Sequence, residues 1–301
     1  MQCDEVLSIF PKEIRELVQS LHLSPDGMQE IRIRAERPIL IRYRNRELVT
    51  GRTVSRDRTA EILAYLGNYS LYAYEAEIRQ GFLSLPGGHR VGLSGKAVME
   101  AGRVKTLGEI SSLNIRFAHQ IRGCADPLVP YIWEGERLLH TLIVSPPGRG
   151  KTTLLRDCIR QISDGSDMRP GKTVGVVDER SEIAGCFRGV PGNDVGMRTD
   201  VLDGCPKAEG MMMLIRSMAP DVVAVDEIGG REDAGSLRYA MNCGCVLLAT
   251  VHGSCMEELL QKPVLRELVE QGIFERYVFL EAGKIPGRIG QILDRQGENV
   301  C

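Results

Sequence analysis

The sequence lacks several features that would assign it to a specialised class of protein. No run of apolar residues approaches the roughly 18 that a membrane-spanning helix needs. The first residues, which include Asp4 and Glu5, have none of the basic and apolar character of a secretory signal peptide. The 9 cysteines include no C-x-x-C pair, which argues against a disulfide framework and against a zinc site. Together these absences predict a cytoplasmic protein with reduced thiols.

Charge is unevenly distributed along the 301 residues. Residues 1–125 carry 18 Lys and Arg against 14 Asp and Glu, a net charge of +4, whereas residues 126–301 carry 20 against 26, a net charge of −6. A shift of this kind, in a chain long enough to bury two hydrophobic cores, predicts two domains. We therefore expect an N-terminal domain over residues 1–125 and a C-terminal domain over residues 126–301.

The N-terminal domain combines patterns of helix and strand. Apolar residues at helical spacing predict helices over residues 11–22 and 55–72, and alternating residues predict strands over residues 30–49. Residues 81–117 are typical of a meander of antiparallel strands, and a short helix is expected to begin at Cys124. This domain is therefore predicted to be the smaller one, of mixed α/β structure.

The C-terminal domain opens with a pattern typical of a phosphate-binding loop. An apolar run from His140 leads into Ser145-Pro-Pro-Gly-Arg-Gly-Lys151-Thr152 and then into an amphipathic helix. In such a strand, loop and helix, backbone amides and the helix N-terminus face bound phosphates, the lysine reaches the β- and γ-phosphates, and the next hydroxyl helps to hold Mg²⁺. Ser145 stands where glycine is usual, so its φ angle must be negative. The predicted nucleotide-binding residues are Ser145, Pro146, Pro147, Gly148, Arg149, Gly150, Lys151, Thr152 and Thr153.

A second apolar run, which begins at Ala219, ends in two carboxylates, Asp226 and Glu227. Such a run predicts a parallel strand that is covered on both faces. Ligands bind beyond the C-terminal ends of parallel strands, so the carboxylates are expected beside the phosphate loop. Asp226 is suited to hold Mg²⁺ together with Thr152, and Glu227 to orient or deprotonate an attacking water. Gly229-Gly230 is expected to permit the turn into the next helix.

Two more strand patterns end in polar residues. Residues 173–178 lead to Asp178-Glu179, and residues 245–252 end in Thr250 and His252. Because parallel strands share one C-terminal edge, these groups are expected around the same phosphate loop. The sequence thus predicts an α/β fold with a parallel sheet and four polar strand ends.

These elements together resemble the secretion ATPases, hexameric motors of type II and type IV secretion and of pilus dynamics. Their Walker A loop, Asp box, Walker B strand and His box match residues 145–152, Asp178-Glu179, Asp226-Glu227 and His252. The resemblance implies a RecA-like P-loop ATPase core that uses ATP and Mg²⁺, with Glu179 and His252 acting in catalysis beside Glu227. In that family, arginines of the N-terminal domain reach the nucleotide phosphates. The candidates by position in the meander are Arg90, Arg103 and Arg116.

A more specific resemblance, over residues 198–221 and parts of the N-terminal domain, is to a sporulation family of endospore-forming bacteria. It implies a homo-oligomeric ring, a hexamer, that energises a channel between mother cell and forespore. It also implies an integral membrane partner, through which the protein would be held peripherally at the membrane of the mother cell. The transported substrate and that partner's identity do not follow from the sequence.

Two other functions fit the same core. One is a nucleic-acid-stimulated translocase or helicase, and the other is a nucleotide-binding switch that hydrolyses too slowly to do work. Six arginines of residues 32–46 could form a nucleic-acid face, but Glu30, Glu36 and Glu47 dilute their charge and the sequence pI is only about 6.3. We therefore do not expect nucleic acid as a partner. No guanine-reading Asn-Lys-x-Asp sequence is present, and nothing else in the sequence separates ATP from GTP.

Overall fold

The computed structural model describes residues 7, 9–283 and 286–301, and the chain divides into two compact units. The N-terminal unit comprises residues 1–119 and 185–192, and the C-terminal unit comprises residues 120–184 and 193–301. The first division therefore falls between His119 and Gln120, whereas the charge pattern placed a boundary after residue 125. None of the helices in the described part of the chain has both the length and the apolar character that crossing a bilayer requires.

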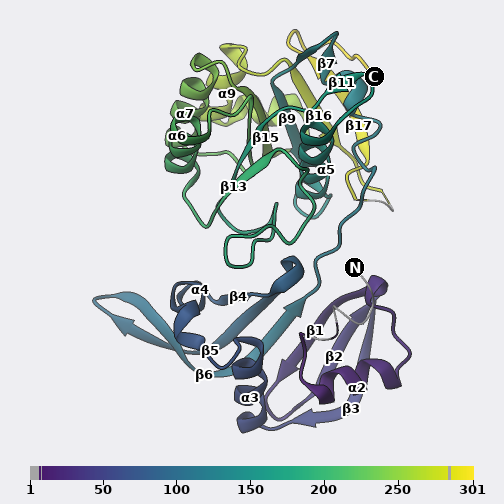
Figure 1. Ribbon diagram of the computed structural model, residues 1–301, viewed down its shortest axis with the longest axis vertical. Coiled ribbons are helices and arrows are strands. Elements are labelled where there is room, and N and C mark those ends of the chain that lie inside the picture. The colour runs from purple at the N-terminus through teal and green to yellow at the C-terminus, as the bar shows by residue number, and fades with distance from the viewer. Residues whose placement is uncertain (1–6, 8, 284–285) are drawn as a thin grey trace. The chain divides into compact units, whose positions relative to one another are not determined.

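The N-terminal unit is built on an antiparallel sheet with the strand order β3-β2-β1-β6-β5-β4 (Figure 1). Mixed α/β structure was predicted for this part of the chain, and the described residues contain both kinds of element. The strands are β1 (Met28–Arg34), β2 (Arg37–Tyr43), β3 (Arg46–Val54), β4 (Phe82–Ser84), β5 (Arg90–Glu100) and β6 (Arg103–Arg116). The helices are α2 (Lys12–Ser20), α3 (Arg56–Leu66) and α4 (Glu75–Arg79), with 3₁₀ turns η1 (Pro25–Gly27), η2 (Leu71–Tyr74) and η3 (Pro86–Gly88).

Helix α2 shows why these residues form a helix on the sheet. Ile14, Leu17 and Val18 recur at the spacing of one helical face, and all three are buried. They share a hydrophobic core with Ile31 and Ile33, whose alternation along β1 points both side chains to the same face. The apolar face of the helix and the apolar face of the strand thus pack together in one core.

Helix α3 is shorter than predicted. It ends at Leu66, whereas the predicted helix extended to residue 72. Gly67 follows the helix, and Asn68 and Tyr69 adopt left-handed backbone with φ angles of 50° and 55°. The amide of Asn68 donates to the carbonyl of Tyr65 at 2.9 Å, which closes the helix end. Asparagine tolerates this conformation better than most residues, so Asn68 is the local signal for the end of the helix.

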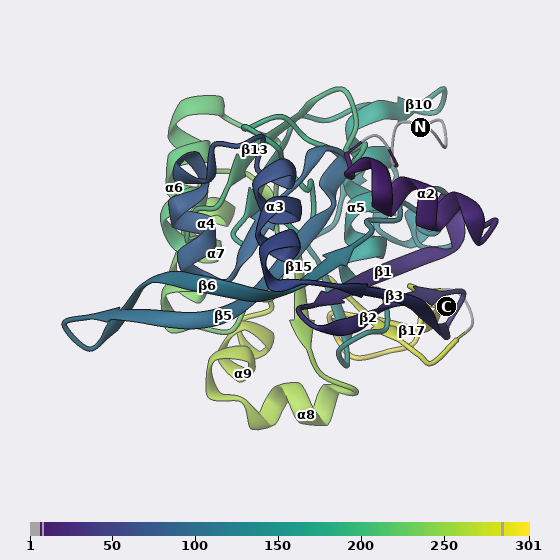
Figure 2. The ribbon, with the colours of Figure 1, turned by 90° about the horizontal axis from the view of Figure 1, so that it is seen from below.

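The strands β5 and β6 form a long hairpin, drawn side by side in Figure 2. Ala101 and Gly102 connect them, and both have positive φ angles, of 48° and 77°, as a two-residue hairpin turn requires. At the other end of the hairpin Arg90 pairs in register with Arg116.

Residues 185–192 belong to the N-terminal unit although residues of the C-terminal unit precede and follow them. Phe187 packs against the hydrophobic core of the N-terminal unit. Phe187 and Val190 exchange backbone hydrogen bonds of 2.9 and 3.1 Å, and the amide of Gly192 donates to the carbonyl of Gly185 at 3.2 Å. The segment is therefore a small hydrogen-bonded loop anchored by one aromatic side chain.

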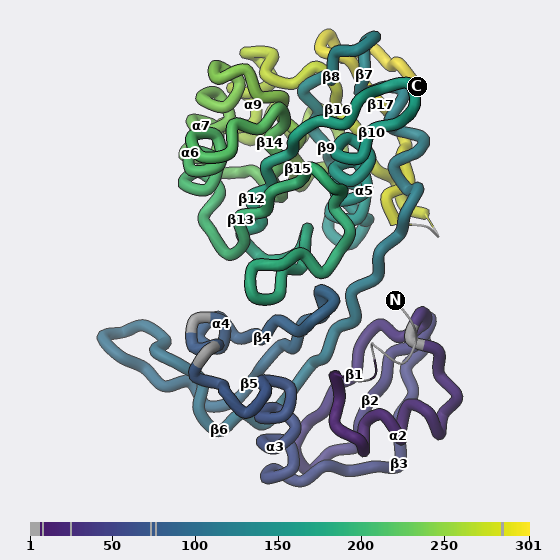
Figure 3. Tube along the Cα trace, viewed as in Figure 1, coloured from purple at the N-terminus to yellow at the C-terminus, as the bar shows by residue number. Residues whose placement is uncertain are grey.

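The C-terminal unit is built on a sheet with the strand order β13-β12-β14-β15-β9-β16-β17 (Figure 3). Neighbouring strands from β13 to β16 are parallel, and β17 is antiparallel to β16. The four predicted parallel strands β9, β12, β14 and β15 are all present, and β13 and β16 extend the parallel part of the sheet to six strands. The bounds are β9 (Thr141–Ser145), β12 (Val174–Asp178), β13 (Thr199–Asp203), β14 (Val222–Val225), β15 (Val246–His252), β16 (Arg276–Leu280) and β17 (Ile289–Asp294).

Helices cover both faces of this sheet, which explains its continuous apolar strands. Val223 and Val225 of β14 pack with α6 (Lys207–Met218), α7 (Arg231–Asn242) and α9 (Pro263–Glu270). Helix α5 (Lys151–Asp164) lies on the other side of the sheet from α6 and α7 (Figure 1). All four residues of β14 are buried.

Short elements complete the C-terminal unit. The helix predicted from Cys124 is replaced by turns and a single 3₁₀ turn, η4 (Val129–Tyr131). Pro130 lacks the N–H that a helix would use there, which accounts for the difference. The remaining elements are β7 (Trp133–Glu134), β8 (Arg137–Leu138), β10 (Gly165–Ser166), β11 (Arg169–Pro170) and α8 (Met256–Gln261).

Candidate nucleotide site at the C-terminal edge of the parallel sheet

The parallel register brings the four predicted strand ends to one edge of the C-terminal unit. Strand β15 pairs with β9 so that His252 lies opposite Ser145. Strand β14 pairs with β15 on one side and with β12 on the other, which places Asp226 between Asp178 and His252 along the edge. The residues that gather here are Lys151, Thr152, Asp178, Glu179, Asp226, Glu227 and His252.

The phosphate loop runs from the buried Ser145 to the first turn of α5. Gly148 and Gly150 have φ angles of 74° and 92°, which glycine adopts without strain. A Cβ at Gly150 would also lie 2.4 Å from the backbone nitrogen of Gly287, so this position is crowded as well as left-handed. The φ angle of Ser145 is not positive, as its place in the loop required, and its hydroxyl donates to the carbonyl of Pro146 at 2.7 Å.

Helix α5 begins at Lys151, so its N-terminal amides face the loop. The partial positive charge at a helix N-terminus favours bound anions, phosphate above all. In the part of the loop beyond Ser145, Pro147, Gly148 and Arg149 are exposed, whereas Lys151 is buried. The loop therefore offers backbone amides to solvent and holds its lysine inside.

Thr152 and Asp226, the two predicted Mg²⁺ ligands, are in direct contact. The Thr152 hydroxyl donates to Asp226 Oδ2 at 2.6 Å, and the Thr250 hydroxyl donates to Asp226 Oδ1. Hydroxyl and carboxylate oxygens are the hard donors that Mg²⁺ prefers. No group of three or more His, Cys, Asp or Glu among the described residues could hold a metal ion by itself. One hydroxyl and one carboxylate suit a Mg²⁺ ion whose other ligands are phosphate and water.

Lys151, His252 and Glu227 form a hydrogen-bonded chain. Lys151 Nζ lies 2.9 Å from His252 Nδ1, and His252 Nε2 lies 2.8 Å from Glu227 Oε1. Because an ammonium can only donate, Nδ1 accepts and Nε2 carries the hydrogen that faces Glu227. Lys151 Nζ is also 3.7 Å from Glu227 Oε1. Burial lowers the pKa of Lys151, and the nearby Asp226 and Glu227 charges oppose that change.

Glu227 has a left-handed backbone, with a φ angle of 55°. Its amide donates to the Thr250 hydroxyl at 2.9 Å, and the amide of Ile228 donates to the Thr250 carbonyl at 2.9 Å. Gly229 and Gly230 lie between β14 and α7, as expected, but neither has a positive φ angle, so their backbone there does not need the conformational freedom of glycine. A non-glycine residue in this region is held by its surroundings, and such residues concentrate at functional sites.

Asp178 is buried, and its carboxylate binds backbone amides of the turn that follows it. Its carboxylate accepts hydrogen bonds from the amides of Glu182, Ile183 and Ala184, at 2.8, 3.0 and 2.8 Å. Burial raises the pKa of Asp178, the three backbone donors lower it, and the neighbouring Asp226 charge raises it further. Asp178 therefore holds the turn over residues 178–184 rather than presenting a carboxylate to solvent.

Arg156, which sequence reasoning missed, holds the same turn through its carbonyls. It is buried within α5, and its guanidinium donates to the carbonyls of Ile183 and Glu182. An arginine on the apolar face of a helix was the available signal, because such a residue needs buried acceptors.

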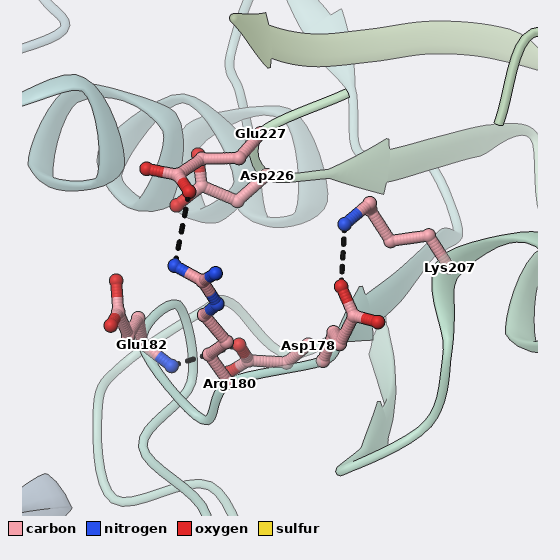
Figure 4. A pocket seen from close by; sticks show the side chains of 7 residues that line it. Asp178, Arg180, Glu182, Lys207, Asp226 and Glu227 are labelled. Carbon is pink, nitrogen blue, oxygen red and sulfur yellow. Dashed lines mark hydrogen bonds and ion pairs between the residues drawn. The ribbon is translucent and has the colours of Figure 1, made fainter. Parts of the chain in front are cut away.

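Two charged side chains that the sequence did not single out complete the edge, and both line the pocket drawn in Figure 4. Lys207, at the start of α6, pairs with the predicted catalytic Glu179. Arg180 Nη1 lies 3.2 Å from Glu227 Oε2. Glu179 is therefore engaged by a lysine, and Glu227 receives donors at both of its oxygens.

The three candidate arginines lie in the N-terminal unit and do not form one cluster. Arg90 and Arg116 are register partners, whereas Arg103 follows the hairpin turn, ~33 Å away along the strand at ~3.3 Å per residue. The Arg90 guanidinium also lies 3.7 Å from the centre of the Phe82 ring. Their roles stay predictions, and within one chain Arg103 lies far from the other two.

Comparison with solved structures confirms the predicted RecA-like α/β fold. The Legionella pneumophila ATPase DotB superposes with a TM-score of 0.60 and 17% identity, covering 94% of this chain and 80% of that one. The pilus retraction motor PilT, solved with bound ADP, gives a TM-score of 0.60 and 16% identity, covering 89% and 77%.

The chain belongs to the family "Sporulation stage III, protein AA", whose model matches residues 1–300. Stage III sporulation protein AA of Bacillus subtilis (strain 168) is 43% identical over 299 residues, which cover 98% of this chain and 96% of that protein. The sporulation family indicated by the sequence is therefore confirmed.

Replacing Asp178 with alanine should destabilise the C-terminal unit. The change leaves three amides without their acceptor, those of Ile183 and Ala184 being buried, and each buried unsatisfied group costs about 1–3 kcal/mol. We expect the free energy of unfolding to fall by about 3 kcal/mol or more in urea titrations monitored by circular dichroism. Asp200→Ala, at an exposed position of β13, is the matched control and should change it by less than about 0.5 kcal/mol. Equal stability of the two variants would contradict the role of Asp178.

Proposed function

We propose that the protein is a Mg²⁺-dependent ATPase motor that works as a homo-oligomeric ring in sporulation. The observation that carries this proposal is the meeting of Lys151, Thr152, Asp226 and Glu227 at the N-terminus of α5. Each of these residues has a distinct part in triphosphate hydrolysis, and together they supply the positioning and electrostatic stabilisation that phosphoryl transfer needs.

The loop and its lysine would hold the phosphates. The exposed backbone at Gly148 and Arg149 and the first turn of α5 provide amide donors, and Lys151 provides a charge. Lys151 now donates to His252 and lies near Glu227, so it would exchange these partners for phosphate oxygens. Thr152 and Asp226 would hold Mg²⁺, which neutralises charge on the phosphates when bound.

Glu227 is the carboxylate best placed to orient water. Its side chain is about one-third exposed, whereas Asp226 accepts from two threonine hydroxyls and Asp178 is occupied by three amides. His252 donates to Glu227 Oε1 and would hold the carboxylate in place. Glu179, paired with Lys207, would support this edge by charge.

Membership of the sporulation family supports the biological setting. We infer that the ATPase, as a hexamer, energises a channel complex between mother cell and forespore through an integral membrane partner on the mother-cell side. The names of DotB and PilT, an ATPase and a retraction motor, support a motor function for the shared fold. One of Arg90, Arg103 or Arg116 would complete a neighbouring subunit's site.

Lys151→Ala should weaken ATP binding at least tenfold without unfolding the protein. The lost charge-assisted contact to phosphate corresponds to roughly 1.5–3 kcal/mol. Isothermal titration calorimetry with Mg·ATP measures the effect. Lys172→Ala, just before the opposite end of β12, is the control and should bind like the unmodified protein. Unchanged ATP affinity in a folded Lys151→Ala would refute the phosphate-loop assignment.

Glu227→Gln should separate binding from hydrolysis. Glutamine keeps the size of the side chain but loses the charge that polarises water, so we expect near-normal ATP affinity and a kcat lower by roughly 10²-fold or more. Steady-state phosphate release measures kcat, with Glu179→Gln run in parallel. Normal hydrolysis by Glu227→Gln together with loss in Glu179→Gln would move the water-orienting role to the β12 strand end.

The shared-site hypothesis predicts that specific activity rises with protein concentration and then reaches a plateau as rings form. Alanine at the correct one of Arg90, Arg103 and Arg116 should lower kcat by roughly 10³-fold. Mixing that variant with Lys151→Ala subunits should restore partial activity if the arginine acts between subunits. ATPase assays alongside mass measurement in solution test this.

Activity that is independent of protein concentration, with all three arginine variants active, would contradict the shared site and leave a self-contained ATPase. Strong stimulation of hydrolysis by DNA or RNA would instead favour a translocase.

A further inference from the structure

The turn over residues 178–184 is rigidly held. Asp178 binds three of its amides, and Arg156 binds two of its carbonyls. Ser181 has a φ angle of 53°, and its hydroxyl donates to Asp203 Oδ1 at 2.6 Å. A turn with this many restraints places the side chains that project from it at defined positions, which is what a functional residue requires.

Arg180 projects from this turn toward Glu227, as Figure 4 shows. Its side chain is 66% exposed, and Nη1 lies 3.2 Å from Glu227 Oε2. The other oxygen of the same carboxylate, Oε1, faces His252 Nε2 at 2.8 Å. Arg180 therefore occupies the oxygen of Glu227 that His252 leaves open.

Acidic side chains outnumber basic ones in this pocket. Its lining holds five carboxylates against two cations, and one of the cations, Lys207, is paired with Glu179. A terminal phosphate that approaches Glu227 would meet this negative charge and needs a compensating donor. A guanidinium suits this role, because it stays charged and its planar fork matches phosphate oxygens. Being largely exposed, Arg180 would change partners at a small desolvation cost.

We propose that Arg180 is a positioning residue that senses the terminal phosphate of a bound nucleoside triphosphate. In the proposed ATPase, on which this inference rests, the guanidinium exchanges Glu227 Oε2 for a terminal phosphate oxygen. That exchange releases Oε2 to accept a hydrogen bond from water. A nucleoside diphosphate has no phosphate at this end of the site, so Arg180 keeps its contact with Glu227. Arg180 thereby couples the presence of the third phosphate to the availability of the water-orienting carboxylate.

The test compares triphosphate and diphosphate binding in the full-length protein. Isothermal titration calorimetry with Mg²⁺ and either the β,γ-imido analogue of ATP or ADP is run on Arg180→Ala, Arg180→Lys and the unmodified chain. We expect Arg180→Ala to lose about tenfold in affinity for the analogue, the loss of one charge-assisted contact, and less than twofold for ADP. Arg180→Lys should recover part of the analogue's affinity. Arg216→Ala, at an exposed position of α6 outside the pocket, is the matched control and should bind both nucleotides normally.

Each outcome decides between the two proposals. Equal losses for the analogue and ADP, or no loss for either, would overturn the sensing role of Arg180 while leaving the ATPase proposal intact. Failure of the unmodified protein to bind either nucleotide would overturn the ATPase proposal itself. If Arg180→Ala does not fold, as judged by its circular dichroism, Arg180→Lys and Arg180→Gln carry the comparison, with glutamine expected to show the selective loss.

Discussion

The parallel pairing of β12, β14, β15 and β9 is the constraint on which the rest of the site depends. Parallel strands end at one edge, so residues far apart in the sequence become neighbours. Lys151 and His252, for example, are 101 positions apart. His252 lies opposite Ser145 only because β15 and β9 share this register. A shift of that register would break the chain from Lys151 through His252 to Glu227, and the antiparallel sheet of the N-terminal unit offers no equivalent edge.

Much of the C-terminal unit could be predicted because its strands are apolar runs with charged ends. The apolar run Val222–Val225 indicates a buried strand, and the acidic pair that follows it marks the end of that strand at the sheet edge. Sequence reasoning failed where an interaction depends on tertiary placement. The left-handed backbone of Glu227 depends on Thr250, which lies on a different strand, and no local pattern reports it. In the sequence, Arg180 is one more charged residue after a strand, and only the folded turn shows that its side chain contacts Glu227.

The acidic residues at this edge differ in what their environments let them do. Asp178 is a structural ligand for backbone amides, Asp226 is bound by two hydroxyls, and Glu227 remains partly open. Sequence alone assigned their roles from position and from the resemblance to secretion ATPases, not from the surroundings of each carboxylate. Burial and the supply of local donors separate them. The same reasoning distinguishes Arg156, which is enclosed by carbonyls, from the exposed Arg180.

Because residues 185–192 return to the N-terminal unit, no single cut of the chain divides it into the two units. The chain passes from one unit to the other after residues 119, 184 and 192. A fragment that began at residue 120 would carry Phe187 away from the core in which it packs and expose it to water. A protease that cut once after residue 119 would leave residues 185–192, which belong to the N-terminal unit, on the C-terminal piece. The N-terminal part is therefore the incomplete folding unit, because it lacks residues 185–192, and the C-terminal part carries Phe187 without the core in which it packs.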